Sequence, residues 1–375
     1  MTVDVGWATS AAKLLEPQDG TCQRRQSPSS ATTTALGPGL CTGGRVGLQR
    51  ADPVALSGGV GRKSELPRDL AIIAEAQAGL ITTAQCRDVG VSPTRVARLL
   101  ESGAWKRVTR GVYDTDSTPV SARHPDRRRR RAAFAAKLAL GPEAVVVGAC
   151  ALALHGVWGL PIALEPQAAL PGGRRAYSRD GIHARMFDGG MTVTEVDGIQ
   201  VATVDWALTQ AVPELDRFHA VAVMDNALNR GLITRDELDE VHDRARGRRG
   251  IATRHGYFAE TDARAESPNE SRARLDCTDN GVPPDVLQVP VRDLSGVMRR
   301  GDLGWVFKDG RILIAEVDSD EHHDLDRLAA DAERHNDITA VSAVVLHFRK
   351  KAVHTPGAVS SVVRATLDRY NDGLP

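Results

Sequence analysis

The sequence lacks several features that would assign it at once to a functional class. No run of about 18 uncharged apolar residues occurs, and Lys13 and Glu16 interrupt the only apolar stretch near the N-terminus. The chain has 48 Lys and Arg residues against 48 Asp and Glu residues, so it is not a polycation, and any nucleic-acid site must be local. We therefore expect a cytoplasmic protein with no membrane contact.

Cysteine is scarce and shows no metal-binding pattern. The five cysteines are Cys22, Cys41, Cys86, Cys150 and Cys277. They form no Cys-x-x-Cys pair and have no histidine at ligand spacing, so we expect free thiols and no structural zinc. The length of 375 residues exceeds what one core usually supports, which predicts about two or three domains.

Residues 1–64 lack any apolar periodicity and are rich in Gly, Ser, Thr, Ala and Pro. This composition predicts a disordered tail. A gene start assigned too far upstream would look the same, so both explanations stay open.

Residues 65–118 carry the signals of three short helices followed by a hairpin. The expected N-caps are Asp69, Thr82 and Ser92, with Pro93 at the first position of the third helix. The apolar face of that helix consists of Val96, Leu99 and Leu100. Residues 105–113 alternate as a short hairpin does. This order of elements predicts a winged helix-turn-helix.

Basic side chains follow the two elements that would contact DNA. The outward residues of the third helix are Thr94, Arg95 and Arg98, and the wing carries Lys106, Arg107 and Arg110. Helix residues in the major groove read base edges, whereas wing residues contact phosphates. The alternative is that these are solvated faces of a small protein-binding module.

This stretch resembles the N-terminal domain of the antitoxin family of abortive-infection, type IV toxin-antitoxin systems. The matching segments are residues 76–82 (AQAGLIT), 90–92 (GVS), 103–105 (GAW) and 107–113 (RVTRGVY). The resemblance implies a DNA-binding winged helix used in transcriptional autoregulation, and a cognate toxin protein as partner.

Residues 122–262 are expected to form a mixed α/β central domain. It begins with five consecutive arginines, Arg127 to Arg131, which are either a solvated helix start or an auxiliary phosphate-contacting patch. Residues 66–134 contain 13 Arg and Lys against 7 Asp and Glu, which favours the patch slightly. The segments 148–156 and 225–228 resemble the central domain of the same antitoxin family, in a pattern of packing residues without a catalytic group.

Residues 263–375 are predicted to follow the order α-β-β-β-α-β-α, with a helix at about 325–338 before the last strand. A turn centred on residues 308–310 would place Asp302 and Glu316 opposite each other, about 5 Å apart between Cβ atoms. Two carboxylates so placed are suited to share one Mg²⁺. A strict two-residue turn would instead oppose residues 302 and 317.

This C-terminal region resembles the PD-(D/E)xK nuclease superfamily, and more closely the endonuclease-like domain related to very-short-patch repair. The resemblance rests on residues 270–274, 300–305, 316–322 and 327–336. It implies a restriction-endonuclease-like fold and metal-dependent hydrolysis of DNA. The residues it implicates are Asp302 and Glu316 as metal ligands, with Glu270, Asp318 and His322 beside them. Asp318 stands where the superfamily has lysine, so the alternative is a polar strand end followed by a solvated acidic loop.

The sequence thus predicts an α+β multidomain protein with two competing functions. The first is a DNA-binding protein whose nuclease-like domain uses Mg²⁺. The second is a non-enzymatic, antitoxin-like transcriptional regulator.

Overall fold

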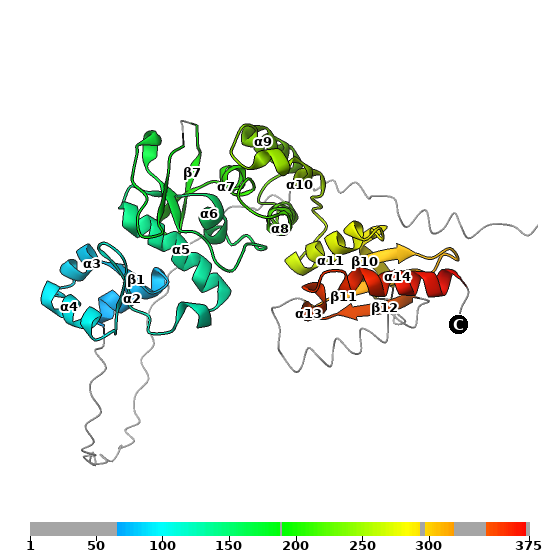
Figure 1. Cartoon of the computed structure of the whole chain (residues 1–375), viewed down its shortest axis with the longest axis horizontal. Coiled ribbons are helices and arrows are strands. Elements are labelled where there is room, and N and C mark those ends of the chain that lie inside the picture. Colours follow the sequence, from blue (N-terminus) through cyan, green and yellow to red (C-terminus); the bar gives the residue numbers. More distant parts are fainter. Residues whose placement is uncertain (1–65, 188–189, 293–296, 319–342, 373–375) are drawn as a thin grey trace, which may run out of the picture. The chain divides into compact units, whose positions relative to one another are not determined.

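The computed structural model describes residues 66–187, 190–292, 297–318 and 343–372 (Figure 1). The predicted tail, the predicted helix at 325–338 and His322 lie outside these residues. The described part of the chain combines helices with three β-sheets, which confirms the α+β class. None of its helices is both long and apolar enough to cross a bilayer.

Residues 66–114 combine three helices with a small antiparallel sheet whose strand order is β1-β3-β2. In chain order the elements are α2 (Arg68–Ala76), β1 (Leu80–Thr82), α3 (Thr83–Asp88), α4 (Pro93–Glu101), β2 (Lys106–Thr109) and β3 (Val112–Asp114). Their core is formed by residues such as Leu70, Ile81, Leu99 and Trp105. Strand β1 is absent from the predicted elements, because three residues are too few to show alternation.

Two of the three predicted N-caps in this segment are confirmed. Oγ1 of Thr82 accepts a hydrogen bond from the backbone N–H of Gln85 at 3.1 Å, and Oγ of Ser92 accepts one from Arg95 at 3.2 Å. The prediction for Asp69 is wrong: Pro67 occupies the N-cap of α2 without a side-chain cap, and Asp69 lies in the first turn. A carboxylate there still stabilises the positive end of the helix.

The following residues form a five-stranded mixed sheet, with strand order β6-β5-β4-β8-β7, and six helices. The strands are β4 (Val145–Val146), β5 (Gln167–Ala169), β6 (His183–Arg185), β7 (Val193–Val196) and β8 (Ile199–Ala202). The helices are α5 (Pro125–Leu140), α6 (Gly148–Leu154), α7 (Val204–Ala211), α8 (Arg217–Asn229), α9 (Arg235–Ala245) and α10 (His255–Ala259). The predicted capping box of α9 is confirmed, since Thr234 accepts from the N–H of Glu237 and Glu237 accepts from that of Thr234.

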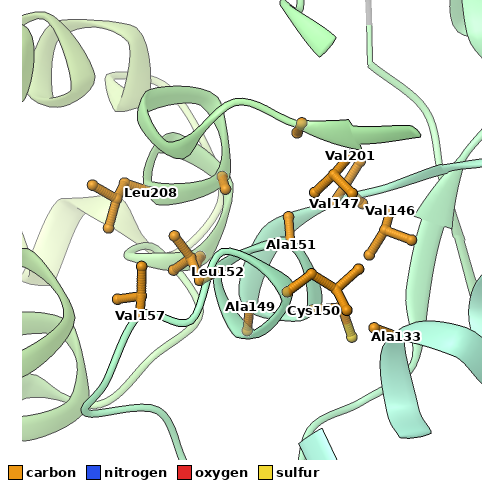
Figure 2. Packing of buried hydrophobic residues seen from close by; sticks show 14 of the residues in the cluster. Ala133, Val146, Val147, Ala149, Cys150, Ala151, Leu152, Val157, Val201 and Leu208 are labelled. Atoms are coloured by element: carbon orange, nitrogen blue, oxygen red, sulfur yellow. The ribbon is translucent and has the colours of Figure 1, made fainter. Parts of the chain in front are cut away.

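Figure 2 shows the centre of this part of the chain, where α6 packs through small side chains. Ala149, Cys150 and Ala151 are almost completely buried, and short side chains allow the helix to approach the sheet closely. Burial raises the pKa of the Cys150 thiol to about 12, so it is a neutral packing group. The predicted free thiols are confirmed for the three cysteines within the described residues, Cys86, Cys150 and Cys277.

The C-terminal residues form a four-stranded sheet with the order β12-β11-β10-β9, antiparallel except for the parallel pair β11 and β12. The elements are α11 (Pro268–Asp279), β9 (Val286–Arg292), β10 (Met298–Val306), β11 (Ile312–Val317), β12 (Ala343–Phe348), α13 (Lys350–Val353) and α14 (Ala358–Asn371). Two glycines of β10 are required by packing. A Cβ at Gly301 would lie 2.3 Å from Cγ2 of Ile314, and one at Gly304 would lie 2.3 Å from Cγ2 of Val289.

Most of the five arginines at the start of α5 make ion pairs with acidic residues of the protein itself. All five side chains are half-buried. Four make ion pairs, which join Arg127 to Glu75, Arg129 to Asp126, Arg130 to Asp197 and Arg131 to Asp114. Successive side chains of a helix point in different directions, so these four arginines pair with acids of different elements, and their charge is already partly compensated within the protein.

Asp114, at the end of β3, is the most buried partner of this run. Its carboxylate is 2% exposed and lies 3.0 Å from Nη1 of Arg123 and 2.8 Å from Nε of Arg131. The backbone N–H of Asp116 donates to the same carboxylate at 3.1 Å. Charges buried in this way are tolerated only when each one is paired and hydrogen-bonded, so Asp114 fixes the sheet of residues 66–114 against α5.

We expect Asp114→Asn to lower the free energy of unfolding by about 3 to 5 kcal/mol, because it removes the buried charge that Arg123 and Arg131 share, and Arg131 then loses its acidic partner. The matched control is Glu75→Gln, which breaks the exposed pair with Arg127 and should cost less than about 1 kcal/mol. Urea unfolding followed by circular dichroism measures both. Equal, small losses for the two variants would contradict an anchoring role for Asp114.

Candidate functional site

Helix α4 has one buried apolar face and one exposed polar face, and its first residue is fixed by an N-cap. Ser92 caps the helix and Pro93 occupies its first position, while Val96 and Leu99 are buried beneath it. The predicted outward residues are placed as expected, since Thr94, Arg95 and Arg98 are all exposed. The spacing of residues 94, 95 and 98 places these side chains on one side of the helix, where an adjacent surface can meet all three.

The hairpin of β2 and β3 places a second set of cations near this sheet. Lys106, Arg107 and Arg110 are exposed, as predicted for a wing. The turn between the strands is held in place: Gly111 has φ +78 and its carbonyl accepts a hydrogen bond from the N–H of Thr83 at 2.9 Å. The hydroxyl groups of Tyr113 and Thr83 are 3.1 Å apart. The R-G-V-Y signature thus fixes the hairpin to the start of α3.

The C-terminal sheet brings two of the predicted acids to facing positions. The register of β10 and β11 pairs Leu303 with Ala315 and Val306 with Ile312. Continued by one residue, it sets Asp302 against Glu316, as the three-residue turn predicts. One oxygen of Asp302 accepts the N–H of Val317 at 2.8 Å, which orients its carboxylate, and both acids are half-buried.

Two further polar residues lie at this level of the sheet and are absent from the sequence predictions. Glu316 is paired with His347 of β12. On the other side, the register of β9 and β10 sets Gln288 at the level of Asp302. Gln288 has φ +55, a strained value for this residue type. Neither Gln288 nor His347 belongs to a sequence motif, so only the strand register could have indicated that they lie beside Asp302 and Glu316.

Glu270, the predicted third acid, reaches the same region from α11. It is 5% exposed, and its carboxylate accepts hydrogen bonds from Nε2 of Gln288 at 2.9 Å and from the N–H of Glu266 at 3.0 Å. Burial raises the pKa of Glu270 above its ordinary value. Gln288 therefore connects the helix acid to β9, the strand beside the one that carries Asp302.

Asp318 lies at the exposed end of β11. Its N–H donates to the carbonyl of Phe348 at 3.0 Å, and its own carbonyl accepts from Nδ2 of Asn269 at 2.9 Å. His322 lies outside the described residues, so its predicted role stays a prediction. Among the described residues no group of three or more His, Cys, Asp or Glu side chains is arranged to hold a metal ion. The pair Asp302 and Glu316 supplies hard oxygen donors of the kind that suit Mg²⁺ with retained waters.

The contact between α8 and α11 depends on Asp225, which is 1% exposed. Its carboxylate accepts hydrogen bonds from Oγ of Ser271 at 2.7 Å, Nη2 of Arg274 at 2.8 Å and the N–H of Asp262 at 2.7 Å. Burial raises the pKa of Asp225 to about 6, opposed by the charge of Arg274. Asp225 belongs to the D-N-A-L segment, for which the sequence predicts a role in packing. In the structure it joins α8 to α11 through hydrogen bonds to Ser271 and Arg274.

Comparison with known proteins gives a match to one family and to two individual proteins. Residues 68–113, which run from α2 into β3, match the family described as "Transcriptional regulator, AbiEi antitoxin". Two proteins from strains of Mycobacterium tuberculosis, "Uncharacterized protein MT2308" and "Uncharacterized protein Rv2248", are each 33% identical to this chain over 229 residues. The aligned region covers 60% of this chain and 77% of each relative.

Proposed function

Because the chain belongs to the same family as the mycobacterial proteins MT2308 and Rv2248, and its residues 68–113 match AbiEi antitoxin regulators, we propose that it is a DNA-binding transcriptional regulator of the antitoxin type. In this proposal residues 66–114 are a winged helix-turn-helix. The observation that carries the proposal is the exposed face of α4, with Thr94, Arg95 and Arg98. The same segment also contains the basic hairpin of β2 and β3.

The order of elements supports this assignment. A helix, a strand, two helices joined by a tight glycine turn and a two-stranded hairpin follow one another, which is the order of a winged helix. Gly90 in the turn before α4 has φ +75, a conformation that glycine adopts without strain. In this fold α4 enters the major groove and the hairpin contacts the backbone beside it.

The distribution of charge supports the same surface. Residues 66–134 carry an excess of basic residues, but Arg123 and four of the five consecutive arginines pair with acids of the protein itself. The exposed cations of this region include those of α4 and the hairpin. Phosphate contacts need cations at the surface, so these two elements are the best suited to bind DNA.

The resemblance to antitoxins extends the proposal to partners and location. The DNA site is proposed to lie upstream of the protein's own gene, where binding would give autoregulation. A cognate toxin is proposed as the protein partner, and the cytoplasm as the compartment, since both DNA and toxin are met there.

We expect Arg95→Ala or Arg98→Ala to weaken binding to the specific site by about 1 to 3 kcal/mol if the side chain contacts a base. Lys106→Ala or Arg107→Ala should weaken binding to all sequences alike and reduce the salt dependence. The matched control is Arg235→Ala on α9, whose side chain is exposed and pairs only loosely with Asp239, at 3.7 Å. Fluorescence anisotropy on the upstream DNA across a salt series measures these effects.

The DNA-reader proposal fails if none of the four variants binds more weakly than the wild-type protein and the Arg235→Ala control. A loss restricted to the hairpin variants would limit the protein to sequence-independent binding.

A second candidate function, hydrolysis of a DNA phosphodiester by the C-terminal region, is favoured by the facing positions of Asp302 and Glu316. Two half-buried carboxylates at opposed strand positions repel each other when both are ionised, and a divalent cation between them removes that repulsion. Bound Mg²⁺ would lower the pKa of a water molecule and offset charge on the phosphate. In this candidate Asp302 and Glu316 hold the ion, and Glu270 and Asp318 stand as the neighbouring acids.

We expect Mg²⁺ or Mn²⁺ to stabilise the protein by about 2.7 kcal/mol at a hundredfold excess over Kd. Asp302→Asn should abolish this shift and any cleavage, while its amide oxygen can still accept the N–H of Val317. The control is Asp309→Asn in the exposed turn of the same hairpin, where the acid pairs with Arg311, and it should keep the shift. Calorimetry with both ions and plasmid nicking with EDTA controls are the measurements. A wild-type transition that neither ion shifts would rule out the metal site and leave the regulator.

A further inference from the structure

An exposed loop of the central region, residues 171–182, has the composition of a nucleic-acid contact. Arg174, Arg175 and Arg179 are all exposed, and Tyr177 between them is 93% exposed. Arginine and tyrosine side chains are among those that donate hydrogen bonds to DNA phosphates and sugars.

The end of this loop has a defined shape. Arg179 and Ile182 exchange two backbone hydrogen bonds, of 3.0 and 2.8 Å, around Asp180 and Gly181. These two residues have φ +52 and +75, as a type I′ hairpin turn requires at both central positions. Oγ of Ser178 also accepts the N–H of Ala184 at 3.1 Å. These hydrogen bonds hold the C-terminal end of the loop in one conformation.

This turn is joined to the hairpin of β2 and β3. Oγ1 of Thr109 donates a hydrogen bond to Oδ2 of Asp180 at 2.7 Å, and Thr109 is only 1% exposed. Arg110 follows Thr109 in the hairpin turn, and Arg179 precedes Asp180 in the loop. The basic hairpin turn and the basic loop are thus neighbours, fixed to each other by a buried donor.

The positive charge of the loop is only partly compensated. Arg174 pairs with Glu143, whereas Nη2 of Arg179 donates to the carbonyl of Ala139 near the end of α5 at 3.0 Å. Within the described residues, Arg175 and Arg179 belong to no ion pair with an acidic side chain. Two uncompensated cations beside the hairpin are complementary to a polyanion.

We propose that residues 174–179 form a second contact to the phosphate backbone of duplex DNA, flanking the hairpin of β2 and β3. The proposal rests on the DNA-binding function proposed above and extends its interface into the central region. Arg175 and Arg179 contact phosphates, Tyr177 hydrogen-bonds or packs against the sugar-phosphate chain, and Asp180 positions the loop through Thr109. These contacts add affinity on any sequence, because phosphates carry no base identity.

The first test uses the full chain, a duplex from upstream of its own gene and a duplex of unrelated sequence. Arg175→Ala should weaken binding to both duplexes by about threefold to tenfold, and the slope of log K against log salt should fall by about one. Tyr177→Ala should weaken binding to both without changing the slope by a full unit. Both side chains are exposed, so the melting temperature should not change, and Arg235→Ala should retain full affinity.

The second test examines the positioning role of Asp180. Thr109→Val removes the donor without changing charge, so it should weaken DNA binding, with little further loss when combined with Arg175→Ala and Tyr177→Ala. Asp180→Asn keeps an acceptor and suits the left-handed backbone, so it should retain or raise affinity. The positioning role of Asp180 is overturned if Thr109→Val lowers the DNA affinity by the same factor in the Arg175→Ala, Tyr177→Ala double variant as in the wild-type protein.

The outcomes separate this inference from the proposed function. If Arg98→Ala loses affinity while Arg175→Ala and Tyr177→Ala bind both duplexes as the wild type does, the loop contact is overturned and the winged helix stands. If the wild-type protein binds neither duplex, both proposals fall.

Discussion

The buried carboxylate of Asp114 is the interaction on which the arrangement of the proposed DNA-binding surface depends. It lies between Arg123 and Arg131, so the last strand of the small sheet is tied to the first turns of α5. Asp114 shares its charge between Arg123 and Arg131, and Asp116 supplies a second carboxylate to Arg123 at 3.2 Å. Separating the hairpin from the helix would leave the buried charge of Asp114 without its partner Arg131. The same helix then pairs Arg127 with α2 and Arg130 with the β7–β8 turn. The segment of residues 66–114 is therefore joined to α5 by the buried pair of Asp114 with Arg131 and by the exposed pair of Glu75 with Arg127.

This constraint decides which cations are left for DNA. A count of charges along the sequence treats all basic residues alike, but most of the run at the start of α5 is neutralised by the fold. The exposed basic residues near the small sheet include those of α4, the hairpin and the loop of residues 174–179. A chain with equal numbers of acidic and basic residues can still present a locally basic surface, which is what the proposed contact with a polyanion requires.

The sequence predicted best where a local rule fixes the geometry. The cap at Ser92 with Pro93, the capping box of Thr234 with Glu237 and the turn that sets Asp302 against Glu316 each follow from a few adjacent residues. Tertiary context decided the rest. Nothing local indicates that the arginine run points inward, that Asp225 joins α8 to α11, or that Gln288 adopts a positive φ beside Glu270. Strands β1, β5 and β6 have three residues each, which is too short for alternation to reveal them.

The central claim is that the chain meets DNA through α4 and the hairpin that follows it. Hydrogen exchange measured with and without the duplex from upstream of the gene tests this most directly, because it reports on every backbone amide at once. The account predicts slower exchange on DNA binding at residues 93–101 and 106–112, extending to 174–182, with strands β9 to β12 unchanged in the absence of metal. Protection confined to residues 286–318, or no protection at all, would contradict it.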